Sequence, residues 1–272
     1  MSKSDMSNIN TDAQGQAPAA INRTRRRVLA GLSGVGATSV LAGCDWTASQ
    51  PVQDFLGKTE GLTQAAQRLV ASRESLAREF DPSEIAPTFK PNGTINPQTD
   101  AYQKLVDNNF GNYQLRVDGL VDKPQSFSLA QLKAMPSRTQ ITRHDCVEGW
   151  SCIGQWTGAV LSDLLDQVQP KDNARFVVFH CADHLFGAPQ PYYESLDMIE
   201  ARHPQTLLAY GLNGADLPVA NGAPIRLRAE RQLGYKMAKY VMHIELVGNF
   251  KNIQGGKGGF WEDRGYNWWA GI

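Results

Sequence analysis

The chain has 272 residues, of which 42% are hydrophobic and 20% charged, enough for one large domain with appendages. Its 27 lysine and arginine residues balance 27 aspartate and glutamate residues, which argues against nucleic-acid binding, because that function usually leaves a strongly basic surface. Four cysteines are too few for a disulfide scaffold. No uninterrupted apolar run reaches roughly 18 residues, so no ordinary membrane-spanning helix is expected.

The N-terminal part has the features of an export signal. A polar leader, typical of disorder, precedes Arg25 and Arg26, and a short apolar stretch runs from Val28 to Ala42. This arrangement resembles a twin-arginine signal peptide. The sequence Leu-Ala-Gly-Cys that ends at Cys44 resembles a bacterial lipobox, whose cysteine becomes acylated. We therefore expect residues 1–43 to be removed and the mature protein to be a periplasmic lipoprotein anchored to the inner membrane through Cys44.

Residues 44–100 are predicted to form a tether, one amphipathic helix and an extended segment. The sequence LTQAAQRLVASRESLAREF, residues 62–80, spaces its apolar side chains as a helix does, and Asp81-Pro82 would end it. The heptads are too few for a coiled coil, so we expect this helix to dock on the main domain. Three prolines in APTFKPNGTINPQ predict an irregular, extended segment.

Residues 101–272 are predicted to form one domain of the α+β class. Apolar residues alternate in YQLRVDGLV, PIRLRAE and KYVMHIELV, RFVVFHC reads as a short buried strand, and TLLAYGLNGADLPV reads as a hairpin. SLAQLKAM, which has a Ser-x-x-Gln capping box, and TGAVLSDLLDQV have helical spacing. Short strands mixed with short helices, without a βαβ rhythm, favour this class. The chain has no GxGxxG or Walker-type loop, so a nucleotide on a Rossmann sheet is not indicated.

The segment ITRHDCVEGWSCIGQWTG, residues 141–158, places Cys146 among charged side chains, which suit a polar cleft better than an apolar core. If Cys44 is acylated, three cysteines remain, so at least one thiol stays unpaired. Several functions stay open from the residues alone. They are a buried structural thiol, a disulfide with Cys152, a nucleophile assisted by a histidine such as His144, and a zinc site using His180, Cys181 and His184. The last two lack a matching local signature.

The segment CVEGWSCIGQWTGAVLSDLL resembles the part of the sulfite oxidase family that carries the molybdenum-ligand cysteine. The resemblance continues through PYYESLDM, HPQTLLAYGLNG, VANGAPIRLRAERQLGYKMAKYV and GFWEDRGYNWWAGI, in the family's order and at similar spacing. It covers most of residues 105–272 and is nearest to the branch of periplasmic protein-methionine-sulfoxide reductases. It implies a sulfite-oxidase-type molybdopterin-binding domain of mixed sheets and short helices. One molybdenum per chain would be bound by the thiolate of Cys146.

The same resemblance implies further site residues. Arg143 and His144 are candidates for lowering the thiol pKa and, with Arg228 and Arg231, for lining an anion pocket. Contacts with the pterin and its phosphate are implied for Asn108, Gly111, Asn112, Cys181, Asn221, Arg226, Met237, Ala238 and Lys239. Cys181 departs from relatives, which often have threonine there. Without the resemblance, Arg226, Lys236 and Lys239 would be read as solvent-exposed side chains.

The implied function is oxygen-atom transfer to or from a sulfur-containing substrate of the sulfoxide or sulfite type. No C-x-x-C-H haem motif is present, so the electron partner would be a membrane haem protein or a c-type cytochrome. The sequence leaves no room for an immunoglobulin-like dimerisation domain after the cofactor motifs, and a monomer is expected. Two alternatives remain: a metal-free, membrane-tethered binding module with the same fold, and a cysteine-dependent hydrolase that uses Cys146.

Overall fold

The computed structural model describes residues 61–70 and 72–272, which belong to one unit, Gly57–Ile272. The predicted signal peptide and Cys44 lie outside the described residues. Among the residues that are described, no helix combines the length and the hydrophobicity needed to cross a lipid bilayer.

The first helix is shorter than predicted, because it covers residues 61–70, a turn follows at 73–74, and the chain continues in extended form from 75 to 80. This extended part bonds to the main domain instead of to itself. The Ala77 N–H donates to Gln205 Oε1 at 2.7 Å, and the Phe80 N–H donates to the Ile141 carbonyl at 2.9 Å. The helix also docks through polar side chains, since Arg68 pairs with Asp197, while its apolar residues are exposed. Tertiary hydrogen bonds have overridden the local periodicity.

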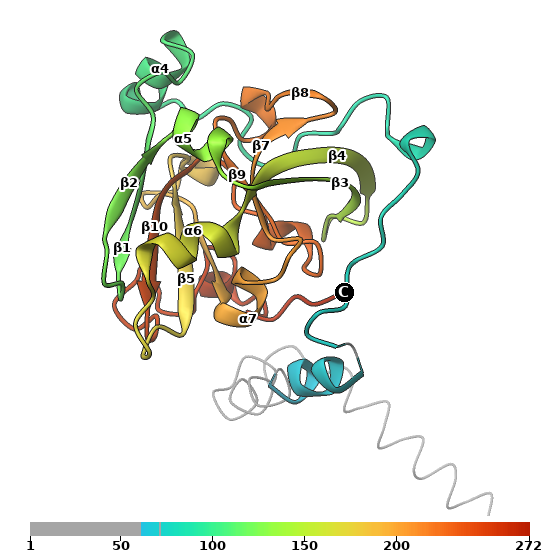
Figure 1. The fold of residues 1–272 in the computed structure, drawn as a ribbon, viewed down its shortest axis with the longest axis vertical. Coiled ribbons are helices and arrows are strands. Elements are labelled where there is room, and N and C mark those ends of the chain that lie inside the picture. The colour runs from blue at the N-terminus through green and yellow to red at the C-terminus, as the bar shows by residue number, and fades with distance from the viewer. Residues whose placement is uncertain (1–60, 71) are drawn as a thin grey trace, which may run out of the picture. The chain divides into compact units, whose positions relative to one another are not determined.

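Two five-stranded sheets form the domain (Figure 1). The first has the order β2-β1-β10-β5-β6, and only its β1–β10 pair is parallel. Its strands are β1 (Gln114–Gly119), β2 (Gln125–Ser128), β5 (Phe176–Cys181), β6 (Tyr193–Asp197) and β10 (Val241–Val247). The second is antiparallel, with the order β3-β4-β7-β8 and with β9 on β7. Its strands are β3 (Ser137–Asp145), β4 (Ser151–Val160), β7 (Leu207–Leu212), β8 (Ala215–Asp216) and β9 (Arg226–Arg228).

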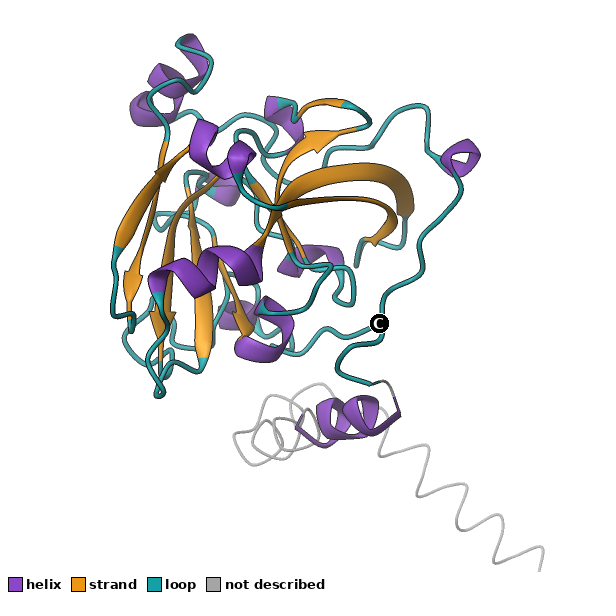
Figure 2. Ribbon diagram, viewed as in Figure 1, coloured by secondary structure: helices purple, strands orange, loops and turns teal. Residues whose placement is uncertain are grey.

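Short helices connect these strands, as Figure 2 shows, and the predicted α+β class is confirmed. After the helix at residues 61–70, the α-helices of the described residues are α4 (Asp100–Asp107), α5 (Leu129–Ala134), α6 (Leu161–Val168) and α7 (Met198–Ala201). The same part of the chain has the short 3-10 helices η1 (Pro82–Glu84), η2 (Leu185–Gly187), η3 (Val219–Asn221), η4 (Gly234–Lys236) and η5 (Glu262–Arg264). The predicted capping box opens α5, where Ser128 Oγ accepts from the Gln131 N–H and Gln131 Oε1 accepts from the Ser128 N–H.

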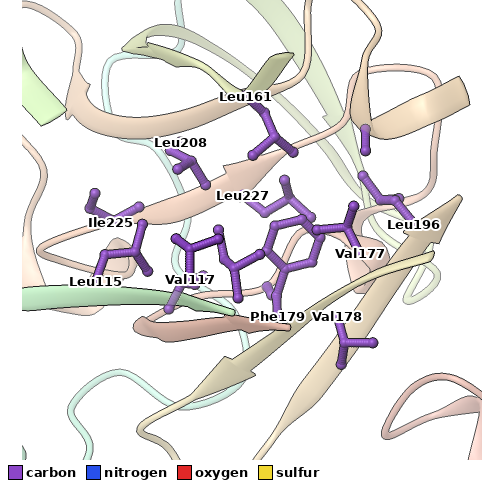
Figure 3. Packing of buried hydrophobic residues seen from close by; sticks show 14 of the residues in the cluster. Leu115, Val117, Leu161, Val177, Val178, Phe179, Leu196, Leu208, Ile225 and Leu227 are labelled. Carbon is purple, nitrogen blue, oxygen red and sulfur yellow. The ribbon is translucent and has the colours of Figure 1, made fainter. Parts of the chain in front are cut away.

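The main apolar core brings β1, β5, β9 and α6 together (Figure 3). On β1, Leu115 and Val117 are buried while Arg116 is exposed, which is the alternation seen in the sequence. Each such buried side chain contributes roughly 1.5–3 kcal/mol to folding. A smaller cluster beneath β4 contains Cys152 and Trp156. Cys152 is therefore a buried, free thiol in an apolar cluster.

An extended segment, residues 80–94, carries the chain from the first helix to the Cys146 region. The Ala86 N–H donates to the Ile153 carbonyl at 3.0 Å, which fixes the segment against β4. Phe89 then packs edge-on against Trp156, with ring centroids 4.8 Å apart. These contacts place Asn92 and its neighbours beside the loop between β3 and β4.

Candidate functional site

A pocket of about 140 Å³ opens beside Cys146. Its walls come from segments that are distant in the sequence: the extended segment, the β3–β4 loop, the chain after β5, η4 and the C-terminal region. The lining residues are Asn92, Gly93, Thr94, Cys146, Val147, Glu148, Asp183, Leu185, Phe186, Tyr192, Gly234, Tyr235, Met237, Lys239, Trp261 and Tyr266. The pocket thus brings together three of the predicted site residues, Cys146, Met237 and Lys239.

A tight loop holds Cys146 in the pocket wall. The Cys146 N–H donates to the Trp150 carbonyl at 2.9 Å, and the Gly149 N–H donates to the Cys146 carbonyl at 3.0 Å. Gly149 has a φ of 85°, a conformation that glycine adopts without steric cost. The thiol is unpaired and half-buried, so it is accessible from the pocket but fixed by the backbone.

The electrostatic surroundings of the thiol differ from those expected. Burial raises the pKa of Cys146, and the charge of Glu148 acts in the same direction, while a hydrogen bond from the Glu148 backbone, the charge of Lys90 and a hydrogen bond from the Asn92 side chain lower the pKa. Arg143 is not the nearby cation, because its Nε pairs with Asp145 Oδ1 at 2.8 Å and its side chain is 52% exposed. Sequence reasoning missed Lys90 and Asn92, which lie more than 50 residues before the cysteine.

His144 does not supply a positive charge to the thiol. Burial, followed by the charges of Arg228 and Arg226, lowers the pKa of His144 well below its ordinary value, so the ring is neutral. Its Nδ1 lies 3.1 Å from Arg228 Nη1 and 3.3 Å from Met237 Sδ. Gly234 makes room for this ring, because a Cβ there would be 2.4 Å from His144 Nε2. The roles expected for Arg143 and His144 at the thiol are therefore corrected: strand alternation directs them to opposite faces of β3.

The expected anion pocket of four basic residues is not formed. Arg228 is fully buried and binds the Glu230 carboxylate through Nε at 2.9 Å and Nη2 at 2.5 Å. Arg231 pairs with Glu200 at 2.5 Å. Neither arginine lines the Cys146 pocket, and each has a carboxylate partner elsewhere.

A basic cluster does lie at the inner end of the pocket. Lys239 is 8% exposed, and its Nζ donates to the carbonyls of Asn92 at 2.6 Å and Ala220 at 3.1 Å, and to that of Thr94. Burial and then the charge of Arg226 lower the pKa of Lys239 to about 7. A lysine with this pKa is poised to gain an anionic partner.

Arg226 lies behind Met237 and Lys239 and is 1% exposed. Its Nη1 donates to the Asn221 carbonyl at 3.0 Å and its Nη2 donates to the Met237 carbonyl at 3.3 Å. Burial and the charge of Arg228 lower the pKa of Arg226 to about 9. The interpretation of Arg226 and Lys239 as solvent-exposed side chains is thus wrong, because both are buried.

Three buried polar atoms around this cluster have no partner among the described residues. They are Asn221 Nδ2, Arg226 Nε and Asp183 Oδ1. Buried polar groups normally have partners, so these two donors and one acceptor indicate a missing polar ligand. Donors beside a lysine suit a phosphate, and a carboxyl acceptor suits a ring N–H, so the residues present fit a molybdopterin. Burial raises the pKa of Asp183, a residue that the sequence interpretation did not select.

Asn108, Gly111 and Asn112 do not line the pocket. Asn108 caps the C-terminal end of α4, and its carbonyl accepts from the Gly111 N–H at 3.1 Å. Asn92, Gly93 and Thr94 of PNGT occupy the pocket wall in their place. The Asn92-Gly93 pair directly follows a proline-rich stretch, and it is the sequence signal that could have identified this part of the wall.

The zinc alternative finds no geometric support in the described residues. There, no group of three or more His, Cys, Asp or Glu side chains is arranged to hold a metal ion. Cys181 is buried in the main core and does not line the pocket. His180 stacks on His243 at 4.9 Å, and His184 Nδ1 contacts the Ala188 carbonyl at 2.8 Å. These side chains therefore face separate surroundings.

Comparison with known proteins identifies the family. The model of the oxidoreductase molybdopterin-binding domain matches residues 102–252, more than half of the chain. The chain belongs to this family. It is 34% identical over 251 residues, 91% of this chain and 87% of the relative, to a putative protein-methionine-sulfoxide reductase subunit of Azospira oryzae. The expected molybdopterin cofactor and the assignment to molybdopterin-dependent oxidoreductases are confirmed.

Two further similarities are partial. The chain is 40% identical over 144 residues to the catalytic subunit of a protein-methionine-sulfoxide reductase of Ralstonia nicotianae, covering 50% of this chain and 44% of that protein. A sulfane dehydrogenase structure from Paracoccus pantotrophus has a TM-score of 0.46 at 23% identity, over 51% of this chain and 39% of that chain.

Proposed function

We propose that this protein removes the oxygen atom from methionine sulfoxide carried by other proteins. The reaction takes two electrons and two protons, breaks the sulfur–oxygen bond, and yields the thioether and water. The proposal rests on one observation: the half-buried Cys146 thiol opens into a pocket whose rim is apolar. The names of the relatives from Azospira and Ralstonia support it.

The rim favours an apolar side chain over a small inorganic anion. Val147, Phe186 and Tyr266 line the pocket and are 43%, 83% and 41% exposed, respectively. Exposed apolar groups gathered at one place mark an interaction site. Phe186 also has a φ of 54°, which is rare for a residue with a side chain and keeps its ring beside Trp261. These groups would contact the methionine side chain and its neighbours.

The chain's own residues would hold the cofactor in a defined orientation. Cys146 would bind molybdenum as a thiolate, with Lys90 and Asn92 favouring that charged form. Arg226 and Asn221 would donate to the phosphate end, and the charge of Lys239 would attract it. When bound, the cofactor supplies two-electron oxygen-atom transfer, and the protein supplies orientation and electrostatics. Asp183 would accept a hydrogen bond from the pterin ring through its free oxygen.

We further propose that the protein is exported through Arg25 and Arg26, anchored through Cys44, and supplied with electrons by a membrane haem protein or a c-type cytochrome. The motifs quoted from the sequence support the first two points. Replacing both arginines by lysine should retain the protein in the cytoplasm. Cys44→Ala should release the mature protein from the membrane fraction, and continued membrane association would contradict anchoring by a lipid.

Turnover with a reduced viologen dye tests the function. Metal-loaded protein should oxidise the dye with a peptide containing methionine sulfoxide, and metal analysis should find about one molybdenum per chain. Sulfite with an oxidised acceptor, run in the reverse direction, is the competing substrate. Sulfite oxidation without sulfoxide reduction would refute the proposed direction. A protein without molybdenum would indicate a binding module, and peptide or ester hydrolysis by metal-free protein would indicate a hydrolase.

A further inference from the structure

A buried ion cluster lies directly behind one wall of the Cys146 pocket. Lys236 Nζ is 2.5 Å from Glu194 Oε1 and 2.5 Å from Glu262 Oε1, and the three side chains are at most 1% exposed. Glu194 comes from β6, Lys236 from η4 and Glu262 from η5. We call these three residues the Lys236 cluster. Its lysine joins three elements that are distant in the sequence.

The charges of the Lys236 cluster do not balance unless it binds a proton. Two carboxylates and one ammonium leave one negative charge, and an uncompensated buried charge is costly. The other titratable groups that interact with the cluster are Cys181, Tyr192 and Tyr193, and none of these is a cation. One proton removes the excess charge and lets the two glutamates hydrogen-bond to each other.

The contacts agree with this protonated form. The two glutamate side chains are within hydrogen-bonding reach, and burial together with the neighbouring Glu262 raises the pKa of Glu194 well above its ordinary value. The Oε2 atoms of both glutamates are buried and have no hydrogen-bond partner among the described residues. Gly259 packs tightly here, because a Cβ would be 2.0 Å from Glu262 Oε2. The cluster is therefore closed to solvent and has no room for a bulkier neighbour.

Each member of the cluster is close in sequence to an aromatic residue that lines the pocket. Tyr235 precedes Lys236, Trp261 precedes Glu262, and Tyr192 lies two residues before the other glutamate. The Tyr192 hydroxyl donates to the Tyr235 carbonyl at 2.7 Å, which links two of the three. We call Tyr192, Tyr235 and Trp261 the aromatic wall. A displacement of the Lys236 cluster would therefore also displace the aromatic wall, because their residues are neighbours in the chain.

We propose that the Lys236 cluster positions the aromatic wall of the Cys146 pocket, and that it does so only while it holds one proton. Loss of the proton leaves two buried carboxylates side by side, and their repulsion separates β6 from η5. The wall then shifts and the sulfoxide binds less tightly, so KM rises at alkaline pH. The effect on KM rests on the proposed function, whereas the movement of the wall does not.

The variant Glu262→Gln tests whether the effect depends on the proton or only on the shape of the cluster. The amide keeps the shape of the side chain, donates to Glu194 and leaves the cluster neutral without a proton. Wild-type KM should rise once the pH exceeds the raised pKa of the glutamate pair, approaching about tenfold per pH unit for the loss of one proton, while KM of the variant stays flat. Glu200→Gln is the matched control, because Glu200 pairs with Arg231 outside the pocket, and it should keep the wild-type rise.

Quenching of Trp261 fluorescence by acrylamide follows the wall without any turnover. Exposure of Trp261 should increase at the same pH as KM in the wild type and should not increase in Glu262→Gln. Trp261→Phe supplies the background from the other tryptophans.

The outcomes separate the two proposals. A fluorescence transition that Glu262→Gln abolishes, in a protein that reduces no sulfoxide, supports the cluster and contradicts the proposed function. Normal sulfoxide reduction with a flat wild-type KM and no fluorescence transition overturns the cluster alone. An alkaline rise of KM that is the same in Glu262→Gln as in the wild type also overturns it.

Discussion

Lys239 should make the metal-free protein less stable at neutral than at alkaline pH. Its side chain is buried beside Arg226, and these surroundings lower its pKa from 10.5 to about 7. In the unfolded chain the pKa returns to about 10.4. Between these two values the unfolded chain binds the proton and the folded chain does not. Stability therefore rises with pH across this window, and the full penalty is present below about pH 7.

The size of the effect follows from the two pKa values. Their difference of about 3.5 corresponds to at most about 5 kcal/mol, and the part that falls between about pH 7 and about pH 9 is about 2 kcal/mol. Urea unfolding of metal-free protein at these two pH values measures it. Lys239→Met removes the titrating group, so its free energy of unfolding should rise by about 2 kcal/mol less than that of the wild type. Lys104→Met, at an exposed position on α4, is the control and should behave as the wild type does. An equal rise in Lys239→Met would refute the reasoning.

Three further predictions concern the pocket. Cys146→Ser should abolish sulfoxide reduction while retaining much of the molybdenum, since the other cofactor contacts remain; wild-type turnover would contradict ligation by this thiol. Arg226→Ala should lower the molybdenum content, because its buried Nε has no partner among the described residues and is available to the cofactor, whereas Arg228→Ala should lower the melting temperature by leaving a buried carboxylate unpaired, at a cost of about 3–5 kcal/mol. Asn92→Ala should raise the pKa of the Cys146 thiol, measured by alkylation of metal-free protein across pH, while Asn108→Ala should leave it unchanged.

The fold class could be predicted from the sequence because local signals and tertiary structure agree in most elements. Alternation on β1 and the capping box of α5 are both realised. The helix expected over residues 62–80 fails after residue 70, where hydrogen bonds to Gln205 and to β3 replace helical ones. Such partners are more than 60 residues away, so no local pattern could reveal them.

The site was harder to predict, because what decides each role is burial. Alternation correctly placed Arg226 and Arg228 on one face of β9, but a period of two does not tell whether that face meets water or the protein interior. Both guanidinium groups stack on the ring of Trp156, at 4.9 Å and 4.3 Å from its centroid. Only the three-dimensional contact with this tryptophan distinguishes a buried cation pair from an exposed one.

Burial of this kind couples cofactor binding to folding. Arg226 and Lys239 are two cations in one low-dielectric region, and the repulsion between them destabilises the folded protein. Glu230 neutralises the charge of Arg228. Arg226 and Lys239, in contrast, have no carboxylate partner in hydrogen-bonding contact among the described residues. A phosphate bound between them would supply the opposite charge and raise the pKa of Lys239 back toward its ordinary value. The alkaline gain in stability attributed to Lys239 should therefore disappear in the metal-loaded protein, because the proton is then bound in the folded state as well as in the unfolded state.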